Sequence, residues 1–133
     1  MKQHKLITWI CRIISAGIML QTLYFKFSGA EESVYIFSEI GMEPWGRYVT
    51  GVAELAASIL ILIPRVSVPG ALLAIGIMAG AILTHLFIIG VVVANDGGLL
   101  FFYACCVFLT SSFVLYSARD SAITVLRKFR AVV

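Results

Sequence analysis

The chain has 133 residues, of which 61% are hydrophobic and 13% are charged, and its formal net charge is +3. Soluble domains carry roughly 25% charged residues, so this composition and the mean hydropathy of +1.02 indicate an integral membrane protein without a soluble catalytic domain. The positive residues lie in particular loops, so they report membrane topology and do not indicate nucleic-acid binding.

A membrane-spanning helix needs about 20 predominantly apolar residues. The sequence offers four such stretches, expected at about 6–25, 46–63, 69–93 and 98–116. We therefore predict an all-α integral membrane protein: a four-transmembrane-helix bundle that forms a single domain over residues 1–133.

The connection between the first two spans contains a further predicted helix. Residues Val34–Ile40 are amphipathic enough to form a short interfacial helix that caps the bundle, with its glutamates toward water. Gly41 and Pro44 are expected to end it. Pro64–Pro69 and residues 95–98 are predicted turns. Residues 117–133 form a basic tail, expected to lie on the membrane surface.

Among the ionisable side chains inside predicted spans, Glu54 in the second and His85 in the third most need an explanation. A charged group at the bilayer centre costs about 2.5–3.5 kcal/mol on insertion scales, so each needs a partner or a task. In consecutive antiparallel helices both would lie about 12 Å below the same surface, at ~1.5 Å per residue. This shared depth predicts that Glu54 and His85 face each other between spans two and three.

Other polar residues of the predicted spans are candidates for the same intramembrane site. Lys26 ends the first span, and Gln21 and Tyr103 are candidate hydrogen-bond donors. Arg12 lies nearer the opposite surface, where a snorkelling or interhelical contact is the more ordinary role. On the last span Leu99, Tyr103, Cys106 and Thr110 share one face, and residues such as Tyr103 and Thr110 are more often packing residues than ligands.

The chain contains three cysteines, Cys11, Cys105 and Cys106, and all lie within predicted spans. An odd number in such positions favours small apolar packing residues over a disulfide framework. The sequence shows no metal-type spacing of cysteine and histidine and no phosphate-binding loop, so no metal site is predicted.

The distribution of positive residues predicts orientation. With both termini inside, the inner side carries seven lysines and arginines, namely Lys2, Lys5, Arg65, Arg119, Arg127, Lys128 and Arg130. The outer side carries only Lys26 and Arg47. The positive-inside rule therefore places both termini in the cytoplasm, and Glu54 and His85 in the outer half of the membrane.

Several sparse motifs, in this order, resemble the DoxX and DoxX-like family of small bacterial four-helix membrane proteins. They are Arg12-x4-Gly17, Lys26, Gly41-Met42-Glu43-Pro44, Gly51-x2-Glu54, Arg65 and Ala81-x3-His85. The resemblance implies a multi-pass protein of the bacterial cytoplasmic (inner) membrane. Some related proteins are subunits of a thiosulfate:quinone oxidoreductase, others are linked to redox-defence complexes, and similar eukaryotic proteins assist receptor assembly.

Three functions remain open at this stage. The first is a small redox-associated membrane subunit, with a membrane or redox protein as partner, in which Glu54 and His85 exchange protons with a quinone. A carboxylate and an imidazole suit this task because their pKa values are adjustable. The second is a non-enzymatic assembly or partner-binding protein in which Glu54, His85 and Lys26 fix the helix register. The third is a pathway for a small solute or protons.

Overall fold

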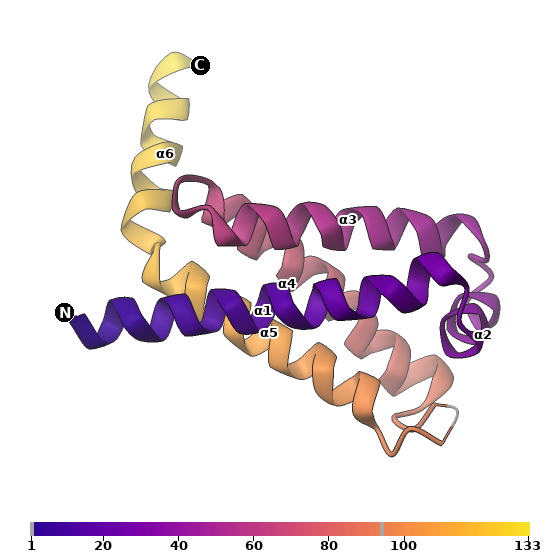
Figure 1. The fold of residues 1–133 in the computed structure, drawn as a ribbon. Coiled ribbons are helices and arrows are strands. Elements are labelled where there is room, and N and C mark those ends of the chain that lie inside the picture. The colour runs from indigo at the N-terminus through magenta and orange to yellow at the C-terminus, as the bar shows by residue number, and fades with distance from the viewer. Residues whose placement is uncertain (1, 94) are drawn as a thin grey trace.

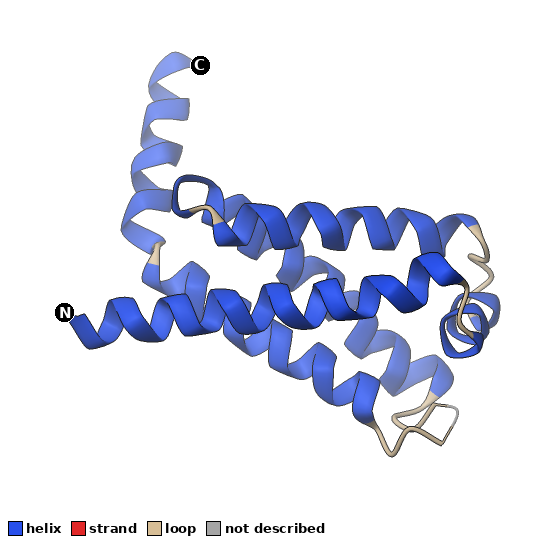
Figure 2. Cartoon of the chain, viewed as in Figure 1, coloured by secondary structure: helices blue, strands red, loops and turns tan. Residues whose placement is uncertain are grey.

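The computed structural model describes residues 2–93 and 95–133. All regular secondary structure among these residues is helical (Figure 2). In chain order the elements are α1 (Lys2–Ser28), α2 (Glu31–Glu39), α3 (Trp45–Leu62), the 3-10 turn η1 (Pro64–Val66), α4 (Ser67–Thr84), the π-helical turn η2 (His85–Ile89), α5 (Leu99–Ser117) and α6 (Arg119–Val132).

Within the described residues four helical segments are long and apolar enough to cross a membrane, at His4–Ser28, Trp45–Leu62, Pro64–Ile89 and Leu99–Ser117. They run side by side as a bundle (Figure 1). Helix α1 packs against α3 and α5, and α4 packs against the same two helices, so the helices form a ring in the order α1, α3, α4, α5. The predicted four-transmembrane-helix bundle is therefore confirmed.

Small residues bring the spanning helices close together. The buried core centres on Met19, Met78 and Val107, and the alanines Ala57 and Ala74 fill the space between them. Because lipid is as apolar as leucine, such close packing and interhelical polar contacts hold membrane helices together. Ser15 of α1 contributes one such contact, since its hydroxyl lies 3.2 Å from the hydroxyl of Ser111 on α5.

The short helix α2 lies across one end of the bundle, which we call the α2 end (Figure 1). Its buried residues are Ser33 and Phe37, while Glu31 and Glu39 are exposed. The predicted interfacial helix is thus confirmed, although it begins at Glu31 and so includes more of the glutamate-rich segment. At the opposite end, called the α6 end, α6 runs across the direction of the bundle helices (Figure 1).

The third span differs from the prediction at both ends. Pro64–Pro69 is not a simple turn, because η1 covers Pro64–Val66 and α4 already begins at Ser67. Pro69 fits in the first turn of α4, where a missing backbone N–H leaves no intrahelical bond unmade. The span ends at Ile89 instead of Val93, because Gly90 adopts φ +83°, which breaks the helix.

The buried face of α5 is not the face that Leu99, Tyr103, Cys106 and Thr110 share. The buried residues are Ala104, Val107, Ser111 and Val114, whereas Leu99 is 46% exposed. The face through Tyr103, Cys106 and Thr110 is only partly buried, and each of these residues directly precedes a buried residue in the chain. Helix α5 is apolar on all sides, so its sequence periodicity carries little information about which side packs.

We predict that Gly70→Ala lowers the stability of the bundle by roughly 1–3 kcal/mol, the usual cost of overpacking. A Cβ at Gly70 would lie 2.5 Å from the backbone nitrogen of Ile61 and 2.8 Å from the carbonyl carbon of Leu60. Helices α3 and α4 would have to separate. Thermal unfolding in detergent measures the effect.

Gly17→Ala is the control for this substitution, because a Cβ at Gly17 would meet nothing within 4 Å. Alanine is the better helix former, so the control should unfold at the same or a slightly higher temperature. Equal unfolding temperatures for the two variants would contradict the close approach of α3 and α4.

Candidate functional site

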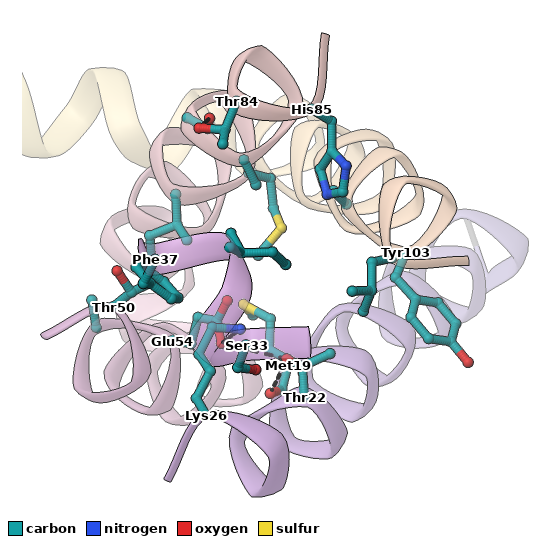
Figure 3. A pocket seen from close by; sticks show the side chains of 18 of the residues that line it. Met19, Thr22, Lys26, Ser33, Phe37, Thr50, Glu54, Thr84, His85 and Tyr103 are labelled. Carbon is teal, nitrogen blue, oxygen red and sulfur yellow. Dashed lines mark hydrogen bonds and ion pairs between the residues drawn. The ribbon is translucent and has the colours of Figure 1, made fainter. Parts of the chain in front are cut away.

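A cavity of about 380 Å³ lies inside the bundle at the α2 end. All four spanning segments line it, and α2 contributes Ser33 and Phe37 to its wall. Most lining residues are apolar, and Figure 3 shows ionisable side chains, among them Lys26, Glu54 and His85, on different sides of the opening. The polar and ionisable lining residues are Thr22, Lys26, Ser33, Thr50, Glu54, Thr84, His85 and Tyr103.

Lys26 and Glu54 form an ion pair on one side of this cavity. The Lys26 Nζ lies 3.1 Å from Glu54 Oε2, and the two side chains are only 15% and 4% exposed. The Thr22 hydroxyl lies 3.4 Å from the same carboxylate oxygen. Thr22 and Lys26 are four residues apart on α1, so both reach the same side of the helix. The cation removes much of the penalty of holding a carboxylate inside the membrane.

Arg47 fixes the end of α1 that carries Lys26. Its guanidinium donates to the backbone oxygen of Lys26, and its Nη2 lies 2.8 Å from Glu43 Oε1. Its guanidinium carbon also lies 4.5 Å from the centre of the Tyr48 ring. A cation at a helix C-terminus satisfies carbonyl groups that have no intrahelical partner. The buried Arg47 therefore joins the end of α1 to the beginning of α3.

His85 is buried on another side of the cavity and begins the π-helical turn η2. Its Nδ1 lies 3.0 Å from the backbone oxygen of Gly90. A carbonyl oxygen can only accept, so Nδ1 must carry the proton and Nε2 of the neutral ring is left as an acceptor. The edge-on ring of Phe101, 5.7 Å away between centroids, further restricts the imidazole. In Figure 3 the ring of His85 points into the cavity.

The carboxylate of Asp96 binds backbone N–H groups between the end of η2 and the first turn of α5. Its Oδ1 accepts from the backbone N–H groups of Val93 and Gly98, at 3.0 and 2.8 Å, and its Oδ2 accepts from Leu100 at 3.2 Å. Burial acts to raise the pKa of Asp96, but these three hydrogen bonds to the carboxylate outweigh it and lower the pKa. The carboxylate thus stabilises this segment at neutral pH, and that contribution is lost only as acid protonates it.

The predicted direct pairing of Glu54 with His85 is wrong. The two residues line the same cavity, but Glu54 pairs with Lys26 and His85 bonds to Gly90. Figure 3 shows Glu54 and His85 on different sides of the opening. Equal depth in the membrane does not fix the direction in which two helices point their side chains. Lys26, at the end of a neighbouring helix, lies closer to the carboxylate.

The other predicted site residues are divided among three places. Tyr103 lines the cavity, but its hydroxyl points away from it (Figure 3). Gln21 is exposed on the outside of α1, whereas its neighbour Thr22 reaches the cavity. Arg12 is buried near the α6 end and lines a separate groove. One cavity is therefore lined by Lys26, Glu54, His85 and Tyr103. Gln21 and Arg12 lie outside this cavity.

Sequence reasoning missed Thr22 and Ser33. The signal for Thr22 was its spacing of one helical turn before Lys26, which places both on one side of α1. Ser33 could be found only by knowing how α2 folds back over the bundle. Among the described residues no group of three or more histidine, cysteine, aspartate or glutamate side chains could hold a metal ion.

We predict that Glu54→Gln and Lys26→Met each destabilise the protein, by up to about 3 kcal/mol, because each leaves a buried charge without its partner. The double variant should lose clearly less than the sum of the two. Thermal unfolding in detergent of the four proteins gives the coupling energy.

Two further pairs of substitutions serve as comparisons for the coupling energy of Lys26 and Glu54. Gln21→Leu changes an exposed residue next to the site, so it should add to Glu54→Gln within about 0.5 kcal/mol. His85→Gln should couple to Glu54→Gln less strongly than Lys26→Met does. Strict additivity of Lys26→Met and Glu54→Gln would show that the ion pair does not stabilise the bundle.

Comparison with known proteins gives a family and nothing finer. Residues 10–110 match the family model described as the DoxX-like family. No curated protein and no solved structure gives a significant match. The matched residues include Lys26, Glu54 and His85, and they extend over most of the chain. The chain therefore belongs to the DoxX-like family of membrane proteins.

Proposed function

We propose that this DoxX-like protein binds a quinone in the cavity at the α2 end and serves as a small membrane subunit of a redox assembly. The observation that carries the proposal is a mostly apolar cavity, about 380 Å³ in volume, with ionisable groups on more than one side. Sites for small ligands typically measure roughly 300–1,000 Å³ and combine apolar walls with a few placed polar groups.

The chemistry of a quinone matches the groups in the cavity. A quinone head group carries two carbonyl oxygens on opposite sides of a flat apolar ring. Lys26 and Thr22 can donate hydrogen bonds to one oxygen, and His85 lies on another side of the cavity. Neutral His85 can accept a quinol O–H at Nε2, and the protonated ring can donate to a quinone oxygen.

Reduction of a quinone to a quinol takes up two electrons and two protons. In this proposal a redox partner protein supplies the electrons, and the protons pass through His85 on one side and the Lys26–Glu54 pair on the other. Glu54 also serves as a positioning residue, because its carboxylate holds the Lys26 ammonium at 3.1 Å. A proton donor has to lie within hydrogen-bond reach of the atom it protonates.

One observation favours a second candidate function, a non-enzymatic assembly or partner-binding protein. Lys26, Glu54 and His85 already have partners within the chain, so the same residues can serve to fix the helix register. Interhelical polar contacts in a membrane protein average about 0.6 kcal/mol, so their contribution would be to specificity more than to stability. The quinone experiment below distinguishes the two functions.

We further propose that the protein resides in the bacterial cytoplasmic membrane with both termini in the cytoplasm. Lys5, Arg65 and the arginines of α6 lie at the α6 end. The α2 end carries Glu31, Glu39 and Asp96. The positive-inside rule then assigns the α6 end to the cytoplasm.

Reporter fusions test this orientation. Fusions after Arg65 and Arg127 should be active in the cytoplasm, and fusions after Glu39 and Asp96 should be active outside. A cytoplasmic signal at Asp96 would overturn the orientation.

The quinone proposal predicts that protein purified in mild detergent retains a quinone, or gains thermal stability when a ubiquinone or menaquinone analogue is added. A ligand at 100 times its Kd stabilises the folded state by about 2.7 kcal/mol. His85→Gln and Thr22→Val should each weaken analogue binding by roughly tenfold, the effect of losing one good hydrogen bond.

Tyr103→Phe is the matched control, because the lost hydroxyl points away from the cavity (Figure 3). It should bind the analogue within about twofold of the wild type, since no hydrogen bond to the ligand is lost. Wild-type protein without quinone and without stabilisation by any analogue would reject quinone binding. Variants that unfold more easily while analogue binding is absent throughout would support the structural function.

A further inference from the structure

A second recess lies at the α6 end, remote in the bundle from the quinone cavity. It is a groove of about 1060 Å³ between the beginning of α1, η1, the beginning of α4, the end of α5 and α6. The proposed quinone function makes no use of it.

The groove combines positive charge with apolar surface. Lys5, Arg12 and Arg65 line it, and the described lining residues include no aspartate or glutamate. Leu72, Leu126 and other apolar side chains complete the lining. A surface that is cationic at one place and apolar at another matches a molecule with an anionic head and an apolar tail.

Arg12 is the feature of the groove that most needs a ligand. Arg12 is only 9% exposed, and the N–H group at its Nε has no hydrogen-bond acceptor among the described residues. The guanidinium carbon lies 4.9 Å from the centre of the Trp9 ring, which packs the cation without neutralising it. A buried N–H without an acceptor is costly, so an anion from outside the chain would supply the acceptor that the Arg12 Nε–H lacks.

Arg12 also lies within the membrane-spanning part of α1, His4–Ser28. An anion that reaches it there has to come from the level of the lipid head groups. Arginine suits phosphate because its planar guanidinium can donate two parallel hydrogen bonds to phosphate oxygens.

Helix α6 supports a lipid in preference to a dissolved anion. It runs across the bundle direction (Figure 1), and Ile123, Leu126 and Phe129 are exposed on it at helical spacing. Its charged residues include Arg127, Lys128 and Arg130. Such a basic amphipathic helix lies in the interface of a membrane, where anionic lipids gather around it.

We propose that the groove at the α6 end is a binding site for one anionic phospholipid. Arg12 binds the phosphate at the inner end of the groove, Arg65 and Lys5 contact it from the rim, and the acyl chains lie along Leu72 and the neighbouring lipid-facing surface. The site is independent of the quinone proposal, because it shares no lining residue with the quinone cavity.

Native mass spectrometry of the full chain in detergent tests the proposal. Wild-type protein titrated with phosphatidylglycerol should retain one molecule more tightly than it retains phosphatidylcholine, by about fivefold or more. Arg12→Gln should weaken phosphatidylglycerol binding by about tenfold, because a charge-assisted hydrogen bond is lost. The affinity of Arg12→Lys for phosphatidylglycerol should lie between those of the wild type and Arg12→Gln, since lysine keeps the charge but lacks the two parallel donors of arginine.

Two more variants keep the test decisive if Arg12→Gln does not fold. Arg65 is exposed at the rim, so Arg65→Gln should fold and still reduce phosphatidylglycerol binding, while analogue binding in the quinone cavity stays unchanged. Arg119→Gln removes one exposed charge outside the groove lining, and it should leave the affinity within about twofold.

Three outcomes would overturn the lipid site. One is equal binding of phosphatidylglycerol and phosphatidylcholine. Another is wild-type affinity in both Arg65→Gln and the folded Arg12 variants. The third is displacement of phosphatidylglycerol by inorganic phosphate at equal concentration, which would assign the groove to a dissolved anion.

Discussion

The architecture of the α2 end depends on keeping a carboxylate inside the bundle. Glu54 is tolerable there because Lys26 meets it at 3.1 Å, and Lys26 can do so only where α1 ends beside the middle of α3. Arg47 holds that helix end by donating to the backbone oxygen of Lys26, and Glu43 in turn pairs with the Arg47 guanidinium. A single buried charge thereby fixes how α1 and α3 meet. The helix α2 then covers the same end of the bundle, with Phe37 buried beneath it.

Much of this fold could be predicted from the sequence, because lipid imposes a simple rule of length and polarity. The second and fourth spans were predicted to within a residue of Trp45–Leu62 and Leu99–Ser117. The prediction was wrong where local backbone geometry determines the ends of a helix. Gly90 ends the third span early through a positive φ, and Pro69 lies inside a helix instead of ending a turn. A hydropathy pattern does not distinguish these alternatives.

In the candidate site, too, some features could be predicted from the sequence and others could not. The cost of burying an ionisable group identified Glu54 and His85, and both line the cavity. Their partners could not be predicted, because partners depend on how each helix is rotated about its axis. On an apolar helix such as α5 the sequence holds little information on that rotation, so Tyr103 was predicted as a donor although its hydroxyl points outward. Thr22 was missed although its spacing of one helical turn before Lys26 places both residues on one side of α1.

Acidic and basic side chains are concentrated at opposite ends of the bundle. This distribution gives the cavity at the α2 end and the groove at the α6 end different electrostatic properties. The α2 end carries the carboxylates of α2 and of the loops beside it, and in its cavity the charges of Lys26 and Glu54 are paired. At the α6 end the groove is cationic and the Nε of Arg12 has no acceptor among the described residues. A site with paired charges suits a neutral ligand, because binding then leaves no charge uncompensated. A site with an unpaired cation suits an anion. The electrostatics therefore fit the two proposals made above, a neutral ligand at the α2 end and an anionic lipid at the α6 end.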